Sequence, residues 1–401
     1  MAERFDHGAA QFVCDFVERL PTTDTGERFR LYDWQRSALS EFYGTMVSSP
    51  DTVGLPAPIN AEWLRKYWYL YLEIPKKNGK SELAAALGLY HLFADGELNA
   101  EVYICAADKD NASIVFNAAV FMATSAPWTA KMIARGELKV IESRRRIEYR
   151  RSVRASNGGR RWVTVGIMQV LSAEAYSKHG YKPSCVIFDE LHAQPSRDLW
   201  DVMTGAAGAS RRQPAWIVLT TAGDDPDRNS IGWEIHAKAV AIRDARQLRR
   251  VQAEGGDVRT ILSLRHVADE DLAEAEEALL ARDEENWLPI LYGLTAMFGD
   301  DPDDLAKLNI WDESLWKLCN PSLGKHLSLR NIRMEAMAAK KSEAAERLFR
   351  WLRLNQWITT KAVSWISLNL YDKTQWGPSK RRERDEWLKR LDGMTCYGGV
   401  D

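Results

Sequence analysis

Cysteine is scarce in this sequence, and the five cysteines lie far apart with no Cys-x-x-Cys pair. An odd number of scattered thiols argues against a disulfide framework and against a structural zinc site. Long apolar runs are also missing, since none approaches the ~20 residues of a membrane-spanning helix. The amino terminus has no signal-peptide pattern. We therefore expect a soluble intracellular protein without a membrane partner.

A strong net charge is absent as well. The formal net charge is −2, so any nucleic-acid-binding surface has to be local rather than general. The sequence shows no internal repeat and no low-complexity tract. Its hydrophobic content of 45% is typical of a globular protein, and 401 residues are enough for two or three domains.

The sequence does contain a strand–loop–helix pattern around Gly-Lys-Ser. Apolar residues 67–74 predict a buried strand and residues 83–90 predict a helix, with Gly79-Lys80-Ser81 between them. Backbone N–H groups at a helix start bind phosphate, the lysine reaches the outer phosphates, and the serine hydroxyl can bind Mg²⁺. Ile74 replaces the first glycine of G-x-x-x-x-G-K-[ST], so the motif alone is weak. The predicted nucleotide-binding residues here are Pro75, Lys76, Lys77, Asn78, Gly79, Lys80, Ser81 and Glu82.

Two acids end a later apolar run. Residues 185–188 predict a central parallel strand that ends in Asp189-Glu190. Asp189 is suited to hold Mg²⁺ together with Ser81, and Glu190 to polarise the attacking water. The run that ends in Thr220-Thr221 predicts another buried strand, whose hydroxyls we interpret as a coupling element.

Two motifs have a structural and a functional interpretation. Trp34-Gln35 is either a core tryptophan beside a surface glutamine or part of an adenine pocket, because a Gln amide both donates and accepts hydrogen bonds. His192 is either a catalytic group or a polar residue at a strand end, and the second interpretation is slightly favoured.

Residues 141–162 are the most basic stretch, with eight arginines and two glutamates. The turn signal Asn157-Gly158-Gly159 predicts two strands joined by a short loop. Three interpretations stay open: a solvated ribbon, a contact with a phosphate backbone, or an arginine that reaches the nucleotide of a neighbouring subunit.

Strand and helix patterns alternate from residue 67 to residue 223, which indicates the open parallel α/β class. Residues 1–60 look mainly helical. Residues 265–310 predict solvated acidic helices rather than a metal cluster, and residues 332–353 predict one long helix.

The order of these motifs resembles the large terminase subunit of tailed bacteriophages, the ATPase and nuclease that packages double-stranded DNA into proheads. The resemblance covers nearly the whole chain from Phe29. The segments that carry it are Phe29-x-Leu31-x-x-Trp34-Gln35, Pro75–Ser81, Asp189–His192, Leu219–Gly223, Asn320–Gly324 and Leu354–Trp357.

The resemblance implies an α/β fold of the P-loop NTPase (ASCE, RecA-like) class, with a mainly parallel sheet flanked by helices and a smaller, mostly helical lid or linker subdomain. We expect an ATPase core with amino-terminal helices in residues 1–260 and the helical subdomain in residues 261–360. Residues 361–401 would hold a linker and the first strand of a truncated RNase H-like nuclease domain. Asp401 would then be the first ligand of an incomplete nuclease metal site.

The resemblance also implies ATP and Mg²⁺ as cofactors and double-stranded DNA, a portal protein and a small terminase subunit as partners. A homo-oligomeric ring in the host cell cytoplasm is expected, with a monomer as the alternative for the isolated chain. An arginine or lysine supplied in trans would come from Arg211 or Arg145, or from Arg144, Arg146, Lys178 or Arg212.

Two other functions remain open at this point. Trp34-Gln35, Gly79-Lys80-Ser81 and Asp189–His192 also occur in the order of a superfamily 2 helicase, although nothing after residue 260 looks like its second RecA-like domain. The chain could also be an assembly protein that binds ATP without hydrolysing it. Glu190 argues against that function.

Overall fold

The computed structural model describes residues 2–48, 63–156, 158–172, 180–205 and 211–359. Lys178, Asp401 and the expected linker and nuclease strand of residues 361–401 therefore lie outside the described residues. Among the helices that are described, none combines the length and the apolar character needed to cross a bilayer.

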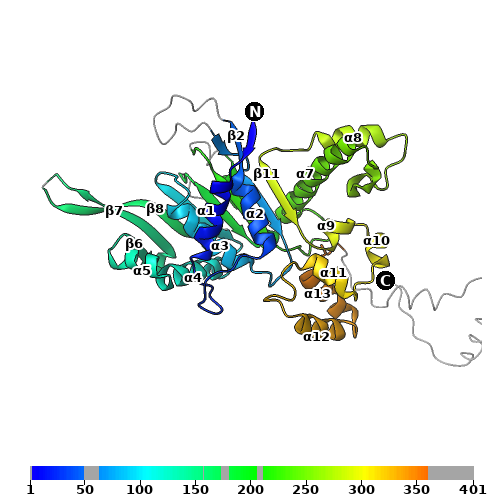
Figure 1. The fold of residues 1–401 in the computed structure, drawn as a ribbon. Coiled ribbons are helices and arrows are strands. Elements are labelled where there is room, and N and C mark those ends of the chain that lie inside the picture. The colour runs from blue at the N-terminus through cyan, green and yellow to red at the C-terminus, as the bar shows by residue number, and fades with distance from the viewer. Residues whose placement is uncertain (1, 49–62, 157, 173–179, 206–210, 360–401) are drawn as a thin grey trace, which may run out of the picture.

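An eight-stranded sheet forms the centre of the protein, in the order β11-β4-β10-β9-β5-β8-β7-β6 (Figure 1). The six strands from β11 to β8 are parallel, whereas β7 and β6 run antiparallel. The α/β class with a mainly parallel sheet is thus confirmed. The strands are β4 (Tyr69–Glu73), β5 (Ala100–Ala106), β6 (Leu138–Ile141), β7 (Arg146–Arg154), β8 (Arg160–Ser172), β9 (Cys185–Asp189), β10 (Ala215–Thr220) and β11 (Trp287–Leu291).

Helices cover both faces of this sheet, which explains why its central strands are apolar throughout. Along β9, Ile187 faces the cluster that includes α1–α4, while Val186 and Phe188 face the cluster that includes α6 and α7. The helices of the first face are α1 (His7–Glu18), α2 (Asp33–Gly44), α3 (Lys80–Phe93), α4 (Lys109–Ser125) and α5 (Pro127–Ala134). Those of the second face are α6 (Asp198–Thr204) and α7 (Ile231–Glu254).

The amino-terminal part contains strands that were not predicted. The strands β1 (Glu3–Phe5), β2 (Thr45–Ser48) and β3 (Trp63–Arg65) form a separate antiparallel sheet. Each strand has only three or four residues, which is too short to show a clear hydrophobic period. Its hydrogen-bond partners are distant along the chain, so the local sequence does not reveal the pairing.

The segment assigned to a helical subdomain contributes β11 to the central sheet, where it pairs with β4. This strand was missed because Trp287–Leu291 is short and follows an acidic helix, α8 (Leu272–Leu280), that packs against α7. The division of the chain at residue 260 stays a prediction, and the sheet extends beyond it.

A cluster of short helices follows, with its own apolar core. They are α9 (Leu294–Phe298), α10 (Pro302–Lys307), α11 (Glu313–Cys319), α12 (Leu329–Ala339) and α13 (Glu343–Leu354). The single helix predicted for residues 332–353 is wrong. Ser342 caps a new helix by accepting a hydrogen bond from the Ala345 amide, so α12 and α13 form a pair that packs together.

Candidate nucleotide-binding site

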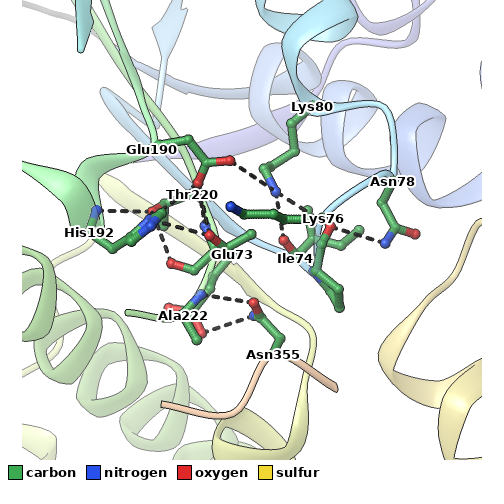
Figure 2. Close-up of polar contacts among 12 residues, drawn as sticks. Glu73, Ile74, Lys76, Asn78, Lys80, Glu190, His192, Thr220, Ala222 and Asn355 are labelled. Carbon is green, nitrogen blue, oxygen red and sulfur yellow. Dashed lines mark hydrogen bonds and ion pairs between the residues drawn. The ribbon is translucent and has the colours of Figure 1, made fainter. Parts of the chain in front are cut away.

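Three predicted motifs meet at one edge of the central sheet. The parallel strands β4, β10 and β9 are neighbours, with Glu73 in register with Thr220 and Leu219 in register with Asp189. Their carboxyl ends therefore lie side by side (Figure 2). In open parallel sheets this edge is where ligands bind.

Residues 74–79, which connect β4 to α3, form the loop predicted to bind phosphate, and we call them the phosphate loop. Gly79 caps α3 in the left-handed region with φ of 88°, and the helix begins at Lys80. The positive end of the α3 dipole and the N–H groups of its first turn are thereby directed to the edge of the sheet. Ser81 lies in this first turn. The Glu82 carboxylate accepts hydrogen bonds from the amide and the hydroxyl of Thr23 and so binds the preceding part of the chain.

The Lys80 amine lies inside this loop. Its Nζ donates to the Ile74 carbonyl at 2.8 Å and lies 3.8 Å from Glu190 Oε1. Burial lowers the pKa of Lys80, and the carboxylates of Glu190 and Asp189 oppose this effect. The amine is therefore held beside the catalytic acid predicted from the sequence.

Asp189 has an unsatisfied oxygen. Its Oδ1 is buried and has no hydrogen-bond partner in the part of the chain that is described. Burial, followed by the negative charge of Glu190, raises the pKa of Asp189 to about 7, against the opposing effect of Lys80. A buried carboxylate oxygen without a partner is a suitable ligand for a hard divalent cation, so the residues fit Mg²⁺.

No group of three or more His, Cys, Asp or Glu side chains suited to a metal occurs among the residues described. One carboxylate and one hydroxyl, from Asp189 and Ser81, leave the other positions to phosphate and water. Mg²⁺ is commonly bound in this way with nucleotides.

Glu190 is held by hydrogen bonds from the neighbouring strand end. Its Oε2 accepts from the Thr221 hydroxyl at 2.9 Å and from the Thr221 amide at 3.2 Å, and lies 3.2 Å from His192 Nδ1. Burial alone would raise the pKa of Glu190, but Lys80, His192 and Thr221 together lower it. Glu190 is thus an ionised carboxylate next to the phosphate loop.

The contact of His192 with Glu190 was not predicted. His192 Nδ1 also lies 3.3 Å from the hydroxyl oxygens of both Thr220 and Thr221, so the imidazole contacts the acid and the two threonines. Its position two residues after Glu190 was the available signal. A polar residue at a strand end has many other roles, so the sequence could not decide.

The loop after Thr221 is bound by the carboxyl-terminal end of α13. The Ala222 amide donates to Asn355 Oδ1 at 2.8 Å, and Trp351 Nε1 donates to the Ala222 carbonyl at 2.7 Å. The Ile358 amide donates to the Gly223 carbonyl at 3.0 Å. These contacts, which were not predicted, attach the expected coupling element to the end of the described chain.

Glu73, the last residue of β4, was also missed. It is fully buried and accepts from Tyr71 Oη at 2.7 Å, and it lies 2.8 Å from His236 Nδ1. Burial would raise the pKa of Glu73, but His236 and the hydrogen bonds lower it. Asn355 Nδ2 donates to Glu73 at 3.3 Å, so one side chain connects β4 to the loop that follows Thr221, which we call the coupling loop after its predicted role. An acid that ends an apolar strand was the signal.

Trp34 and Gln35 lie beside the phosphate loop and are buried. Trp34 Nε1 donates to Ser322 Oγ at 3.0 Å. Gln35 Oε1 accepts from the Tyr32 amide at 3.0 Å, and its Nε2 lies next to Gly79. The adenine pocket stays a prediction, for which the Gln35 amide is well placed.

Two other predicted loop residues, Asn78 and Lys76, differ in which of their groups a phosphate could contact. The Asn78 side chain is fully buried and donates to Pro75 O and Asn320 Oδ1, so only its backbone is available to a phosphate. The Lys76 side chain extends toward the side of the site that carries Glu190, and its Nζ lies 5.9 Å from the centre of the Trp351 ring (Figure 2).

The proposed trans-acting arginines lie at opposite edges of the sheet. Arg145 is in the turn before β7, near the carboxyl end of β8, and pairs with Asp110 at 3.6 Å. The Arg211 guanidinium donates to the backbone carbonyls of Lys182 and Leu98, both at 2.8 Å, at the amino ends of β9 and β5. The structure therefore places Arg145, but not Arg211, at the edge that carries the phosphate loop.

Comparison with known proteins identifies the same region. Residues 63–236 match the family model described as terminase large subunit, ATPase domain. The terminase large subunit of Enterobacteria phage HK97 is 30% identical over 165 residues, which cover 40% of this chain and 29% of that protein. Neither a helicase nor a non-hydrolysing assembly protein is supported by these matches.

One solved structure supports the fold. The crystal structure of the HK97 bacteriophage large terminase is similar with a TM-score of 0.57 and 20% identity, over 87% of this chain and 55% of that chain. The large terminase ATPase domain of Thermus phage P74-26 gives a TM-score of 0.33 and 22% identity over 39% of this chain and 61% of that chain. This chain spans about half the length of the solved HK97 protein.

Proposed function

We propose that this chain hydrolyses ATP and couples hydrolysis to the movement of double-stranded DNA into a prohead, because residues 63–236 match the ATPase-domain model of terminase large subunits. The observation that carries this proposal is the convergence of Lys80, Asp189 and Glu190 at the end of β4 and β9. A phosphate loop, a buried acid with a free oxygen and an ionised glutamate are the parts that nucleotide hydrolysis needs.

The loop amides and Lys80 would bind the β- and γ-phosphates. Asp189 and Ser81 would hold Mg²⁺, which supplies charge neutralisation at the phosphate oxygens when it is bound. Glu190 orients and polarises the attacking water, because its carboxylate is ionised. Lys76 would add a second positive charge on the side of Glu190. Gln35 would contact the base.

Hydrolysis removes the γ-phosphate, and Thr220 and Thr221 would couple this loss to a movement of the loop that follows them. Thr221 binds Glu190, and the next residue binds Asn355 and Trp351. A displacement of the Glu190 carboxylate therefore changes the contacts of a loop that is attached to α13. This connection supports the role of coupling element.

The proposed partners are double-stranded DNA, a portal protein, a small terminase subunit and further copies of the chain in a ring. The proposed location is the cytoplasm of the host cell. Arg145 is the better candidate for a residue acting in trans, since its turn lies at the edge of the phosphate loop.

The first test is phosphate release by the purified chain. We expect phosphate release in the presence of ATP and Mg²⁺. Added EDTA should stop this release, and duplex DNA should stimulate it. A chain that binds ATP without releasing phosphate under any of these conditions would instead be a nucleotide-binding assembly protein.

The outer half of the β7–β8 hairpin is the surface we propose for the DNA. Residues 150–154 pair only with residues 160–164, beyond the ends of β5 and β6. Figure 1 shows this ribbon projecting on the side opposite the helices α11–α13. It carries five arginines and no acid, together with the exposed ring of Trp162. Such a surface fits a phosphate backbone.

Replacement of Arg150, Arg151 and Arg154 by Ala is expected to flatten the salt dependence of duplex binding. Three lost phosphate contacts correspond to a decrease of roughly 2.7 in the magnitude of the negative slope of log K against log salt. Fluorescence anisotropy with a labelled duplex at several salt concentrations measures it. The control replaces Arg250, Arg265 and Arg330, three arginines outside the ribbon, and should leave the slope unchanged. An unchanged slope in the ribbon variant would make the ribbon a solvated surface.

A further inference from the structure

The phosphate loop contains a strained residue that is not glycine. Two loop residues adopt the left-handed region, Gly79 with φ of 88° and Lys77 with φ of 69°. Glycine does so freely, whereas a residue with a Cβ atom is disfavoured there. Lys77 therefore needs contacts from elsewhere to keep this conformation.

One such contact comes from the loop between α11 and α12. His326 Nε2 lies 2.7 Å from the Lys77 carbonyl oxygen, and His326 Nδ1 lies 2.9 Å from Tyr32 Oη. A carbonyl oxygen only accepts, so Nε2 carries a proton and donates it to Lys77, while Nδ1 and the tyrosine hydroxyl are within hydrogen-bond distance of each other. The two rings also stack, with centroids 5.2 Å apart. His326 is thus fixed on both sides.

The next residue is bound by the same loop. Asn78 Nδ2 donates to Asn320 Oδ1 at 3.0 Å, and Asn78 Oδ1 accepts from the Ser322 amide at 3.3 Å. A carboxamide suits this position because it donates from its nitrogen and accepts at its oxygen. The Ser322 hydroxyl lies 3.4 Å from the Asn78 carbonyl oxygen and also accepts from Trp34.

These contacts determine the direction of two peptide units. In a trans peptide the carbonyl of one residue and the N–H of the next point in opposite directions. The Lys77 carbonyl is directed to His326 and the Asn78 carbonyl to Ser322. The N–H groups of Asn78 and Gly79 are consequently directed away from these side chains, as an anion-binding loop requires.

We propose that residues 320–326 form a clasp that holds the phosphate loop in its anion-binding conformation, with His326 and Ser322 as positioning residues. The clasp compensates for a loop that has Lys77, with a φ of 69°, where glycine would be easier to accommodate. Nucleotide affinity then depends on residues about 250 positions downstream that do not contact the nucleotide. This inference rests on the proposed nucleotide binding.

A double-mutant cycle tests the clasp, with Mg²⁺-ADP as the ligand and titration calorimetry as the measurement. His326→Ala is expected to weaken ADP binding about fivefold, the effect of one neutral hydrogen bond. In a Lys77→Gly background the left-handed conformation is easily reached, so the same substitution should weaken binding less than about twofold. In a Lys77→Ala background, which also lacks the amine but keeps Cβ, the fivefold loss should persist.

His266→Ala is the matched control, because His266 is exposed and pairs with Asp304 on the surface. It should leave ADP affinity unchanged. If His326→Ala does not fold, as judged by circular dichroism, Ser322→Ala replaces it in the same two backgrounds. An equal loss in the Gly and Ala backgrounds, or no loss in either, overturns the clasp. A wild-type chain that binds no nucleotide overturns the proposed function itself, so the two failures are distinguishable.

Discussion

Replacement of Glu190 by Gln is expected to reduce steady-state ATP hydrolysis on the order of 10³-fold while nucleotide binding is retained. Gln has nearly the same shape, and its oxygen can still accept from Thr221. It lacks the negative charge that polarises the water, however, and it removes the ion pair of 3.8 Å with Lys80. Phosphate release and ADP affinity, measured on the same preparation, separate the two effects.

Two further variants delimit this result. Lys80→Ala should abolish hydrolysis and also weaken binding, because it removes the group that reaches the phosphates. Thr221→Ser, which keeps the hydroxyl that donates to Glu190, should retain most of the activity. Near-normal turnover by Glu190→Gln would mean that another group activates the water, and the assignment of the site would be wrong.

Asp189→Asn is expected to abolish Mg²⁺-dependent hydrolysis and, without Mg²⁺ or nucleotide, to stabilise the fold at alkaline pH. The pKa of Asp189 is raised from 3.8 to about 7, chiefly by burial. A raised pKa means that the protonated acid favours the folded state below pH 4 and that this contribution is lost as the pH rises through 7. Above pH 7 the wild-type protein carries a buried negative charge on Asp189, and the Asn variant lacks this charge.

The free energy of unfolding that Asp189→Asn gains over the wild type should accordingly be about 2–3 kcal/mol larger at pH 8 than at pH 5. Urea denaturation at both pH values in the presence of EDTA measures it. Asp15→Asn, a substitution on the exposed face of α1, serves as the control and should show no such difference. A gain that is equal at the two pH values would mean that Asp189 does not carry a buried charge.

Much of the fold followed from local patterns. The apolar runs of β4, β9 and β10 are recognisable because a strand covered on both faces needs no polar residue. By contrast, β11 and the break between α12 and α13 were missed. The first depends on pairing with a strand more than 200 residues earlier, and the second on a single serine cap.

The sequence by itself determined which residues end or follow the central strands, and hence the identity of Lys80, Asp189 and Glu190 as candidates. Burial pattern and strand direction are local properties, so they place such residues at one edge of the sheet. Only the tertiary structure decided that His192 touches Glu190, that Asn355 connects Glu73 with the coupling loop, and that Asn78 faces Ser322. The contacts of Asn355 and Asn78 join segments more than 100 positions apart, and hydrogen bonds of that kind depend on the path of the chain rather than on local pattern. His192 and Glu190 are close in the sequence, but their contact depends on the side-chain directions in the turn after β9.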